Sequence, residues 1–71
     1  MGRVIDPIYV AYCMCRDKLN AHPKGYEFTM EWGTMSEAKS RSLRIIMHDF
    51  VKLGYIERVS DSETSTTFRK L

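Results

Sequence analysis

Basic and hydroxyl side chains gather in one stretch near the middle of the chain. Between Ala38 and His48 there is no acidic residue. The polar side chains of this stretch are Lys39, Ser40, Arg41, Ser42, Arg44 and His48. Arginine can pair with the edge of guanine in the major groove, and short hydroxyls and lysine suit phosphate oxygens. The net charge of +2 only permits a nucleic-acid partner, so the local clustering carries the prediction. The alternative is a solvated helix face.

The pattern around this stretch predicts a helix over residues 36–53. When residues are laid out at about 100° each, one arc is apolar and the opposite arc is mostly basic. The apolar arc holds Leu43, Ile46, Met47, Phe50 and Leu53, and the opposite arc holds Arg41, Arg44, Ile45, His48 and Lys52. Ser36 is the predicted N-cap, and Gly54 is predicted to end the helix in a left-handed position. Ile45 suits either a thymine methyl group or packing within the protein.

A β-hairpin is predicted over residues 55–71. Residues 55–59 and 64–71 are rich in aromatic and β-branched side chains, and the polar residues 60–63 between them predict a turn. The hairpin carries three further basic residues, Arg58, Arg69 and Lys70. We expect these to meet a sugar-phosphate backbone, whereas Asp61 and Glu63 would repel phosphate at the tip.

The first helix is predicted over residues 7–20, with Asp6 as N-cap and Pro7 at the first helical position. It is apolar nearly all round. Such a helix is either deeply buried or shared with a partner subunit. We therefore expect a homodimer formed through Tyr9, Tyr12 and Cys13.

Residues 26–35 permit two interpretations. Large apolar residues alternate with polar ones from Tyr26 to Trp32, which favours a half-buried strand. Alternatively, Thr29 caps a short helix that contains Met30, Trp32 and Met35, although Gly33 weakens such a helix.

This order of elements resembles the winged helix-turn-helix superfamily. The residues that carry the resemblance are Ser40, Ser42, Leu43, Met47, Phe50, Gly54, Tyr55 and Ile56. The resemblance implies one α+β winged-helix domain over residues 1–71, with a recognition helix and a C-terminal hairpin as the wing. It implies a sequence-specific double-stranded DNA-binding protein, a small transcriptional regulator such as those of phages or mobile elements. The chain departs from the family at Trp32-Gly33, where the second helix usually has a Leu-Ala pair.

The alternatives to a DNA-binding protein are a protein-interaction module and an enzyme. A winged helix can also serve as a protein-interaction module, which the modest net charge and the acidic hairpin tip would suit. An enzyme is not expected, because the sequence has no acidic pair at metal spacing, no Ser/His/Asp set and no glycine-rich phosphate loop. His48 and Asp49 are adjacent and would point about 100° apart on a helix.

No metal, cofactor or small-molecule ligand is expected. Cys13 and Cys15 would point about 200° apart on a helix, which is unsuited to one metal ion, and they are interpreted as small apolar fillers. The sequence shows no signal peptide and no apolar run long enough to span a membrane, so a cytoplasmic location is expected.

Overall fold

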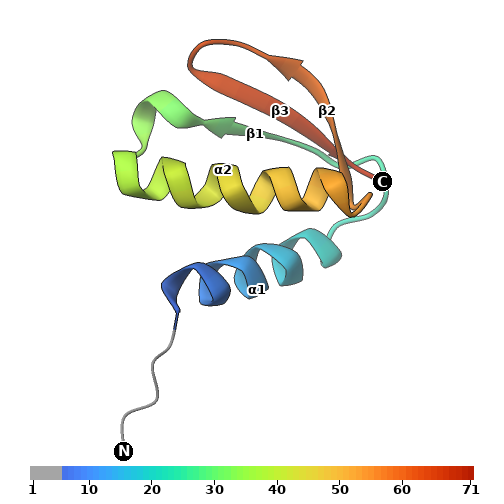
Figure 1. Ribbon diagram of the computed structural model, residues 1–71. Helices are drawn as coiled ribbons and strands as arrows, with labels where there is room; N and C mark the ends of the chain where they lie inside the picture. Colours follow the sequence, from blue (N-terminus) through green and yellow to red (C-terminus); the bar gives the residue numbers. More distant parts are fainter. Residues whose placement is uncertain (1–5) are drawn as a thin grey trace, which may run out of the picture.

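The chain folds into two helices and a three-stranded antiparallel sheet, in a computed structural model that describes residues 6–71 (Figure 1). The elements in chain order are α1 (Pro7–Asn20), β1 (Glu27–Glu31), the 3₁₀ turn η1 (Trp32–Thr34), α2 (Glu37–Lys52), β2 (Ile56–Asp61) and β3 (Ser65–Lys70). The α+β class expected from the sequence is confirmed. The first five residues, which bear on the absence of a signal peptide, lie outside the described residues.

The sheet has the order β1-β3-β2, so the last strand lies in the middle. Phe28 of β1 and Arg58 of β2 both lie opposite Phe68 of β3. The pairing between β2 and β3 shifts between Arg58 and Ser60, which leaves Val59 as the extra residue of a β-bulge. The first strand of the hairpin runs further than predicted, because β2 continues through Ser60 and Asp61, which were predicted to lie in the turn.

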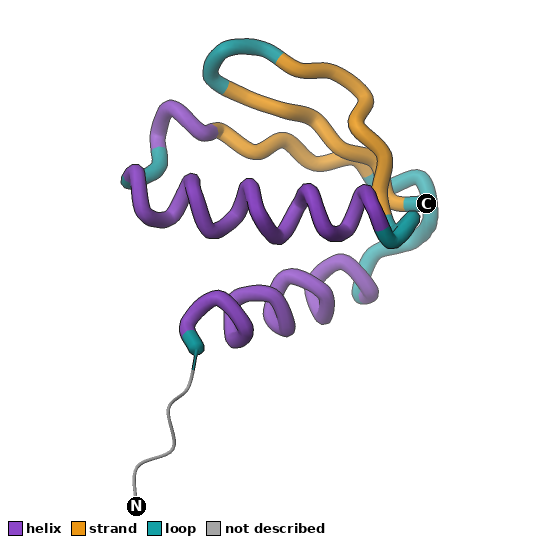
Figure 2. The backbone as a smooth tube through the Cα atoms, viewed as in Figure 1, coloured by secondary structure: helices purple, strands orange, loops and turns teal. Residues whose placement is uncertain are grey.

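Helix α2 lies between the sheet and α1, which gives the molecule three layers (Figures 1 and 2). The core forms where α2 packs on the sheet and on the end of α1. Its buried apolar side chains are Leu19, Trp32, Ile46, Met47, Phe50, Ile56 and Phe68. Phe50, Phe68, Ile46 and Ile56 are the most completely enclosed. Because Ile46, Met47 and Phe50 of α2 cluster with buried residues of β2 and β3, the core fixes the position of α2 against the hairpin.

Both ends of α2 follow from local chemistry. The Ser36 side chain accepts a hydrogen bond from the backbone nitrogen of Lys39 at 3.2 Å, which satisfies one of the free N–H groups of the first turn. Gly54 has a φ of +80° and ends the helix, as predicted. The prediction that Leu53 belongs to the core is wrong, because the helix stops at Lys52 and Leu53, as the C-cap, is 54% exposed.

Helix α1 has the predicted bounds, and the Asp6 carboxylate accepts a hydrogen bond from the Ile8 nitrogen at 2.9 Å. Tyr12 packs edge-on against Phe50, with ring centroids 5.0 Å apart. Leu19 is the only fully buried residue of this helix. The alternative that α1 is deeply buried within its own chain is therefore wrong. Of the two helices in the described part of the chain, neither is long and apolar enough to cross a membrane.

The segment whose conformation was left open contains both kinds of structure. Residues 27–31 form the strand β1, and the chain then makes the single 3₁₀ turn η1. Trp32 is buried at the start of this turn, and the Met35 nitrogen bonds to its carbonyl oxygen. The Gly33 nitrogen bonds to the carbonyl of Thr64 at 3.1 Å, which ties the turn to the hairpin. A short turn thus stands where the resemblance implied a second helix.

Candidate nucleic-acid interface

A hollow of about 230 Å³ lies between α2 and the β2–β3 hairpin. Arg44 and His48 reach its rim from α2, and Arg58 reaches it from β2. These residues were predicted as DNA contacts from separate stretches of the sequence, and the fold brings them together. The lining consists of Trp32, Arg44, Met47, His48, Arg58, Asp61, Thr66 and Phe68.

The β-bulge at Val59 explains why Arg58 and Asp61 share this hollow. Without a bulge, residues three apart on a strand point to opposite faces of the sheet. Here Arg58 lies opposite Phe68 and Asp61 lies opposite Thr66, and both of those β3 residues are buried against α2. Because of the extra residue Val59, the Arg58 and Asp61 side chains both point toward α2.

A chain of hydrogen bonds holds the floor of the hollow. The Trp32 indole Nε1 donates to Thr66 Oγ1 at 2.9 Å, and Thr66 Oγ1 donates to Asp61 Oδ1 at 2.6 Å. Thr66 is 5% exposed, so its hydroxyl is shielded from water and uses both partners inside the protein. This relay joins η1 to both strands of the hairpin, and it occupies one oxygen of the Asp61 carboxylate, which lines the hollow together with Arg58.

Arg44 is held in place although it is exposed. Its guanidinium carbon lies 4.6 Å from the centroid of the Trp32 ring, in cation–π geometry. Its Nε donates to Ser40 Oγ at 3.2 Å, one turn earlier on α2. A guanidinium positioned by two contacts loses less conformational entropy when it binds a ligand. Arg44 is therefore the best-organised cation of the hollow.

The first two turns of α2 carry the other predicted contacts. Lys39 and Arg41 are exposed, whereas Ser42 is half-buried. Arg41 forms a 3.3 Å ion pair with Glu37, but both side chains are largely in solvent, at 72% and 89% exposure. Such a pair is worth little, and a phosphate or base could displace it. Ser40 already accepts the bond from Arg44.

Arg69 and Lys70 are placed away from this surface. Arg69 is on the opposite face of the sheet, where its guanidinium pairs with Glu27 at 2.8 Å and with Glu57 at 3.5 Å. The hydrogen bonds and charge of Glu27, followed by the charge of Glu57, raise the pKa of Arg69. Lys70 donates through Nζ to the backbone carbonyl of His22, beside the end of α1. Arg69 and Lys70 therefore make contacts within the protein and do not line the hollow.

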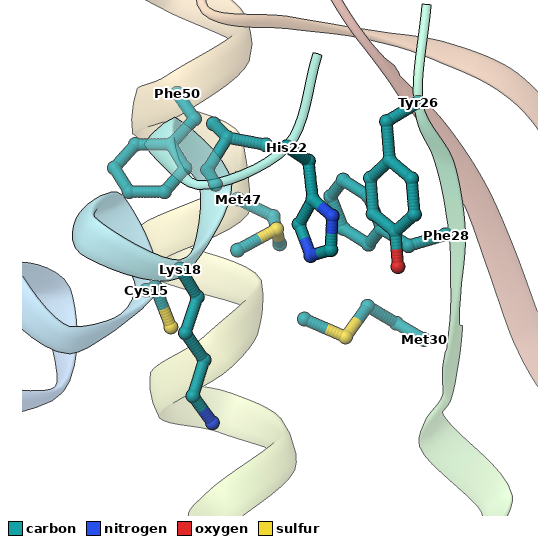
Figure 3. Close-up of a pocket in the computed structure, with 9 residues that line it drawn as sticks. Cys15, Lys18, His22, Tyr26, Phe28, Met30, Met47 and Phe50 are labelled. Carbon is teal, nitrogen blue, oxygen red and sulfur yellow. The ribbon is translucent and has the colours of Figure 1, made fainter.

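A second hollow, of about 200 Å³, opens between α1, α2 and β1. Figure 3 shows the sulfur atoms of Cys15, Met30 and Met47 around it, with the rings of His22 and Tyr26 stacked along one side. Its remaining walls are Lys18, Leu19, Phe28 and Phe50. This mostly apolar space lies beside the C-terminal end of α1, where the loop at His22 leads into Tyr26 and β1.

Within residues 6–71, no group of three or more His, Cys, Asp or Glu side chains is placed to hold a metal ion. Burial raises the pKa of the Cys15 thiol, and the nearby Lys18 only partly offsets this. Among the described residues, neither cysteine takes part in a disulfide.

Sequence reasoning did not identify the residues that organise the hollow. From the sequence, Trp32 was placed only in a half-buried strand or a short helix, and Thr66 was only one residue of the predicted strand 64–71. The alternation along β3 carried a signal, because it places Thr66 on the same face as Phe68. Nothing in the sequence marked the bulge at Val59 or the partner that it gives to Asp61.

No protein-family model matches this sequence, and neither the curated proteins nor the solved structures give a match.

Proposed function

We propose that this protein binds double-stranded DNA as a winged-helix transcriptional regulator, with α2 in the major groove and the β2–β3 hairpin as the wing. The single observation that carries the proposal is the meeting of Arg44, His48 and Arg58 at one hollow, from two different elements. A helix and a hairpin that present basic side chains on one surface can contact bases and phosphates together.

The arrangement of elements supports this proposal. A helix followed by an antiparallel hairpin, with the last strand in the middle of the sheet, is compatible with a winged helix. The turn η1 takes the place of a second helix. It holds Trp32 under Arg44, so the departure from the usual pattern lies beside the proposed interface.

The exposed arc of α2 provides the side chains for base contacts. Arg41, Arg44 and His48 follow one another at spacings of three and four residues, and each is exposed. Arginine can donate two bonds to guanine O6 and N7 in the major groove. Ile45 lies in the same arc and is 50% exposed, which suits a thymine methyl group.

The proposed interface is therefore smaller than the set predicted from the sequence. It comprises Lys39, Arg41, Arg44 and His48 of α2 with Arg58 of the wing. Arg69 and Lys70 are left out, because each has partners elsewhere in the protein. Specific base recognition is assigned to Arg41 and Arg44, and backbone contact to Lys39 and Arg58.

The test is a fluorescence-anisotropy titration of random-sequence duplex DNA over a series of salt concentrations. We expect affinity to fall steeply with salt, because phosphate contacts release counterions. We expect the double variant Arg41→Ala/Arg44→Ala to bind more weakly at every salt concentration. Failure of the wild-type protein to bind at low salt would overturn the proposal.

A second candidate function is protein contact without DNA, and the apolar hollow in Figure 3 favours it. Exposed apolar clefts are common sites for partner side chains. If this were the function, substitution of Met30 by Glu would abolish partner capture, and Arg41→Ala/Arg44→Ala would not affect it. If the protein binds DNA, Arg41→Ala/Arg44→Ala should weaken DNA binding and Met30→Glu should leave it unchanged.

A further inference from the structure

Four side chains with soft donor atoms line the hollow of about 200 Å³ between α1, α2 and β1. They come from α1, the loop that follows it, β1 and α2, and are Cys15, His22, Met30 and Met47. Figure 3 shows the three sulfur atoms and the outer edge of the imidazole ring turned toward one space. Because the four residues are far apart in the sequence, their spacing carries no metal-binding signal. They are called the soft-ligand cluster below.

We propose that the soft-ligand cluster binds one Cu(I) ion. Cys15 is the thiolate ligand, His22 binds through a ring nitrogen, and the two methionines bind through their thioether sulfurs. When the copper–sulfur bond forms, the Cys15 thiol gives its proton to water and the copper stays in the +1 state. Binding therefore needs no oxidant or reductant. The proposal stands independently of DNA binding, because its test measures the metal alone.

The donor atoms determine which metal ion fits the cluster. Thiolate and thioether sulfur favour Cu(I), and imidazole nitrogen also suits copper. None of the nine residues that line the hollow is acidic, so the hollow lacks the carboxylate ligands typical of Mg²⁺ and Ca²⁺ sites. One cysteine and one histidine are too few for a structural zinc site, which takes four ligands from cysteine, histidine or acidic residues. The two thioethers therefore make Cu(I) the best match.

The charges around the hollow are compatible with this ion. Among the residues that line it, Lys18 is the one with a permanent charge, and its ammonium group would repel a free cation. Once Cys15 is a thiolate, the bound ion and its ligands carry no net charge. No uncompensated charge is then buried, and the repulsion by Lys18 is offset. Lys18 is also exposed, so solvent and salt screen its charge.

Two of the ligands are held in place by the fold. The His22 ring stacks on the Tyr26 ring, with centroids 3.8 Å apart and an interplanar angle of 5°. The His22 carbonyl accepts a hydrogen bond from Lys70 Nζ, which ties the loop to β3. Met47 is 3% exposed and packs in the core. Ligands held in this way lose little entropy on binding, and the flexible, half-buried Met30 can close on the ion.

The first test is the Cu(I) affinity of two matched variants, measured anaerobically by competition with the chelator bathocuproine disulfonate. Cys15→Ser and Cys13→Ser each remove one thiol from α1, but Cys13 does not line the hollow. We expect Cys15→Ser to lower the affinity at least about tenfold, since the loss of even an indirect support of a metal ligand costs that much. We expect Cys13→Ser to bind as tightly as the wild type. Equal affinities of the two variants would overturn the proposal.

A second matched pair tests the thioethers and decides the matter should Cys15→Ser not fold. Leucine replaces methionine at nearly constant volume, so Met30→Leu and Met14→Leu are both expected to keep the fold. Met14 is 56% exposed and does not line the hollow. We expect Met30→Leu to lower the Cu(I) affinity about tenfold and Met14→Leu to leave it unchanged. A folded Met30→Leu variant that binds like Met14→Leu would overturn the proposal.

X-ray absorption at the copper edge then counts the ligands in the wild-type complex. We expect sulfur neighbours from three side chains and one imidazole nitrogen. In the His22→Gln variant, the imidazole contribution should disappear while the sulfur contribution remains. A wild-type spectrum with a single sulfur neighbour, or one without imidazole, would overturn the proposal.

Discussion

The guanidinium carbon of Arg44 lies 4.6 Å from the ring centroid of Trp32, whose indole donates to Thr66 at the centre of the sheet. The contact between Arg44 and Trp32 and the hydrogen bond from Trp32 to Thr66 together link α2, η1 and the hairpin. They make the position of the exposed Arg44 depend on a buried hydrogen-bond relay. The stability of the fold and the organisation of the proposed interface can therefore be tested at the same residues.

The first prediction concerns the relay. Thr66→Val keeps the shape and β-branching of the side chain but leaves the Trp32 indole N–H buried without a partner. An unsatisfied buried donor costs about 1–3 kcal/mol, so we expect the free energy of unfolding to fall by that amount in urea denaturation.

The matched control is Thr67→Val, one residue further along β3. Thr67 shares a 2.9 Å hydrogen bond with Thr29 on the exposed face of the sheet. Water can replace that bond, so we expect a loss below about 1 kcal/mol. Equal losses at the two positions would show that the relay does not stabilise the fold.

The second prediction concerns the end of α2. Gly54 has a φ of +80°, and a Cβ atom built there would meet nothing within 4 Å. Gly54→Ala should therefore lower stability through backbone strain alone, by about 1–2 kcal/mol. Gly54→Asn should lose less, since asparagine tolerates the left-handed region better. Thermal unfolding of both variants checks this order, and the reverse order would contradict it.

The third prediction concerns thiol chemistry. Burial raises the pKa of Cys15, so at a given pH less thiolate is present than for an ordinary cysteine. In the Cys13→Ser variant, alkylation by iodoacetamide should be slower in the folded protein than in urea. The midpoint of its pH–rate profile should also lie at higher pH when folded. A folded-state midpoint at or below the urea value would contradict the burial of Cys15.

The linked effect on stability has a definite sign. The folded state holds the Cys15 proton more tightly than the unfolded state, so the free energy of unfolding should be constant at low pH. It should then decrease as the pH rises through the ordinary thiol range. The Cys15→Ser variant serves as the control, because it should lack this decrease.

Much of the fold was predictable because local signals determine it. The Asp6-Pro7 start of α1, the Ser36 cap and the Gly54 stop are chemical requirements of helix ends, and the structure has all three. The prediction failed for Leu53, because periodicity alone cannot tell the last helical residue from the cap that follows it. The burial of α1 could not be judged from the sequence, since it depends on how much protein surrounds the helix.

The candidate site was predictable in its residue types and only partly in its geometry. The spacing of Arg41, Arg44 and His48 placed them on one exposed arc, which the structure confirms. The location of Arg69 followed instead from strand pairing, which sets it opposite both Glu27 and Glu57. Such cross-strand neighbours depend on register and on a bulge, neither of which a single sequence specifies.

The central claim is that DNA meets the hollow between α2 and the hairpin, and two arginines of the same hairpin test it most directly. Arg58→Gln and Arg69→Gln each remove one positive charge, but Arg58 lines the hollow and Arg69 is on the other face of the sheet. Binding of duplex DNA is measured for both variants and the wild type over a salt series. We predict that Arg58→Gln weakens binding and lowers the salt slope by about one, while Arg69→Gln leaves the slope unchanged. Equal slopes for the two variants would contradict the account.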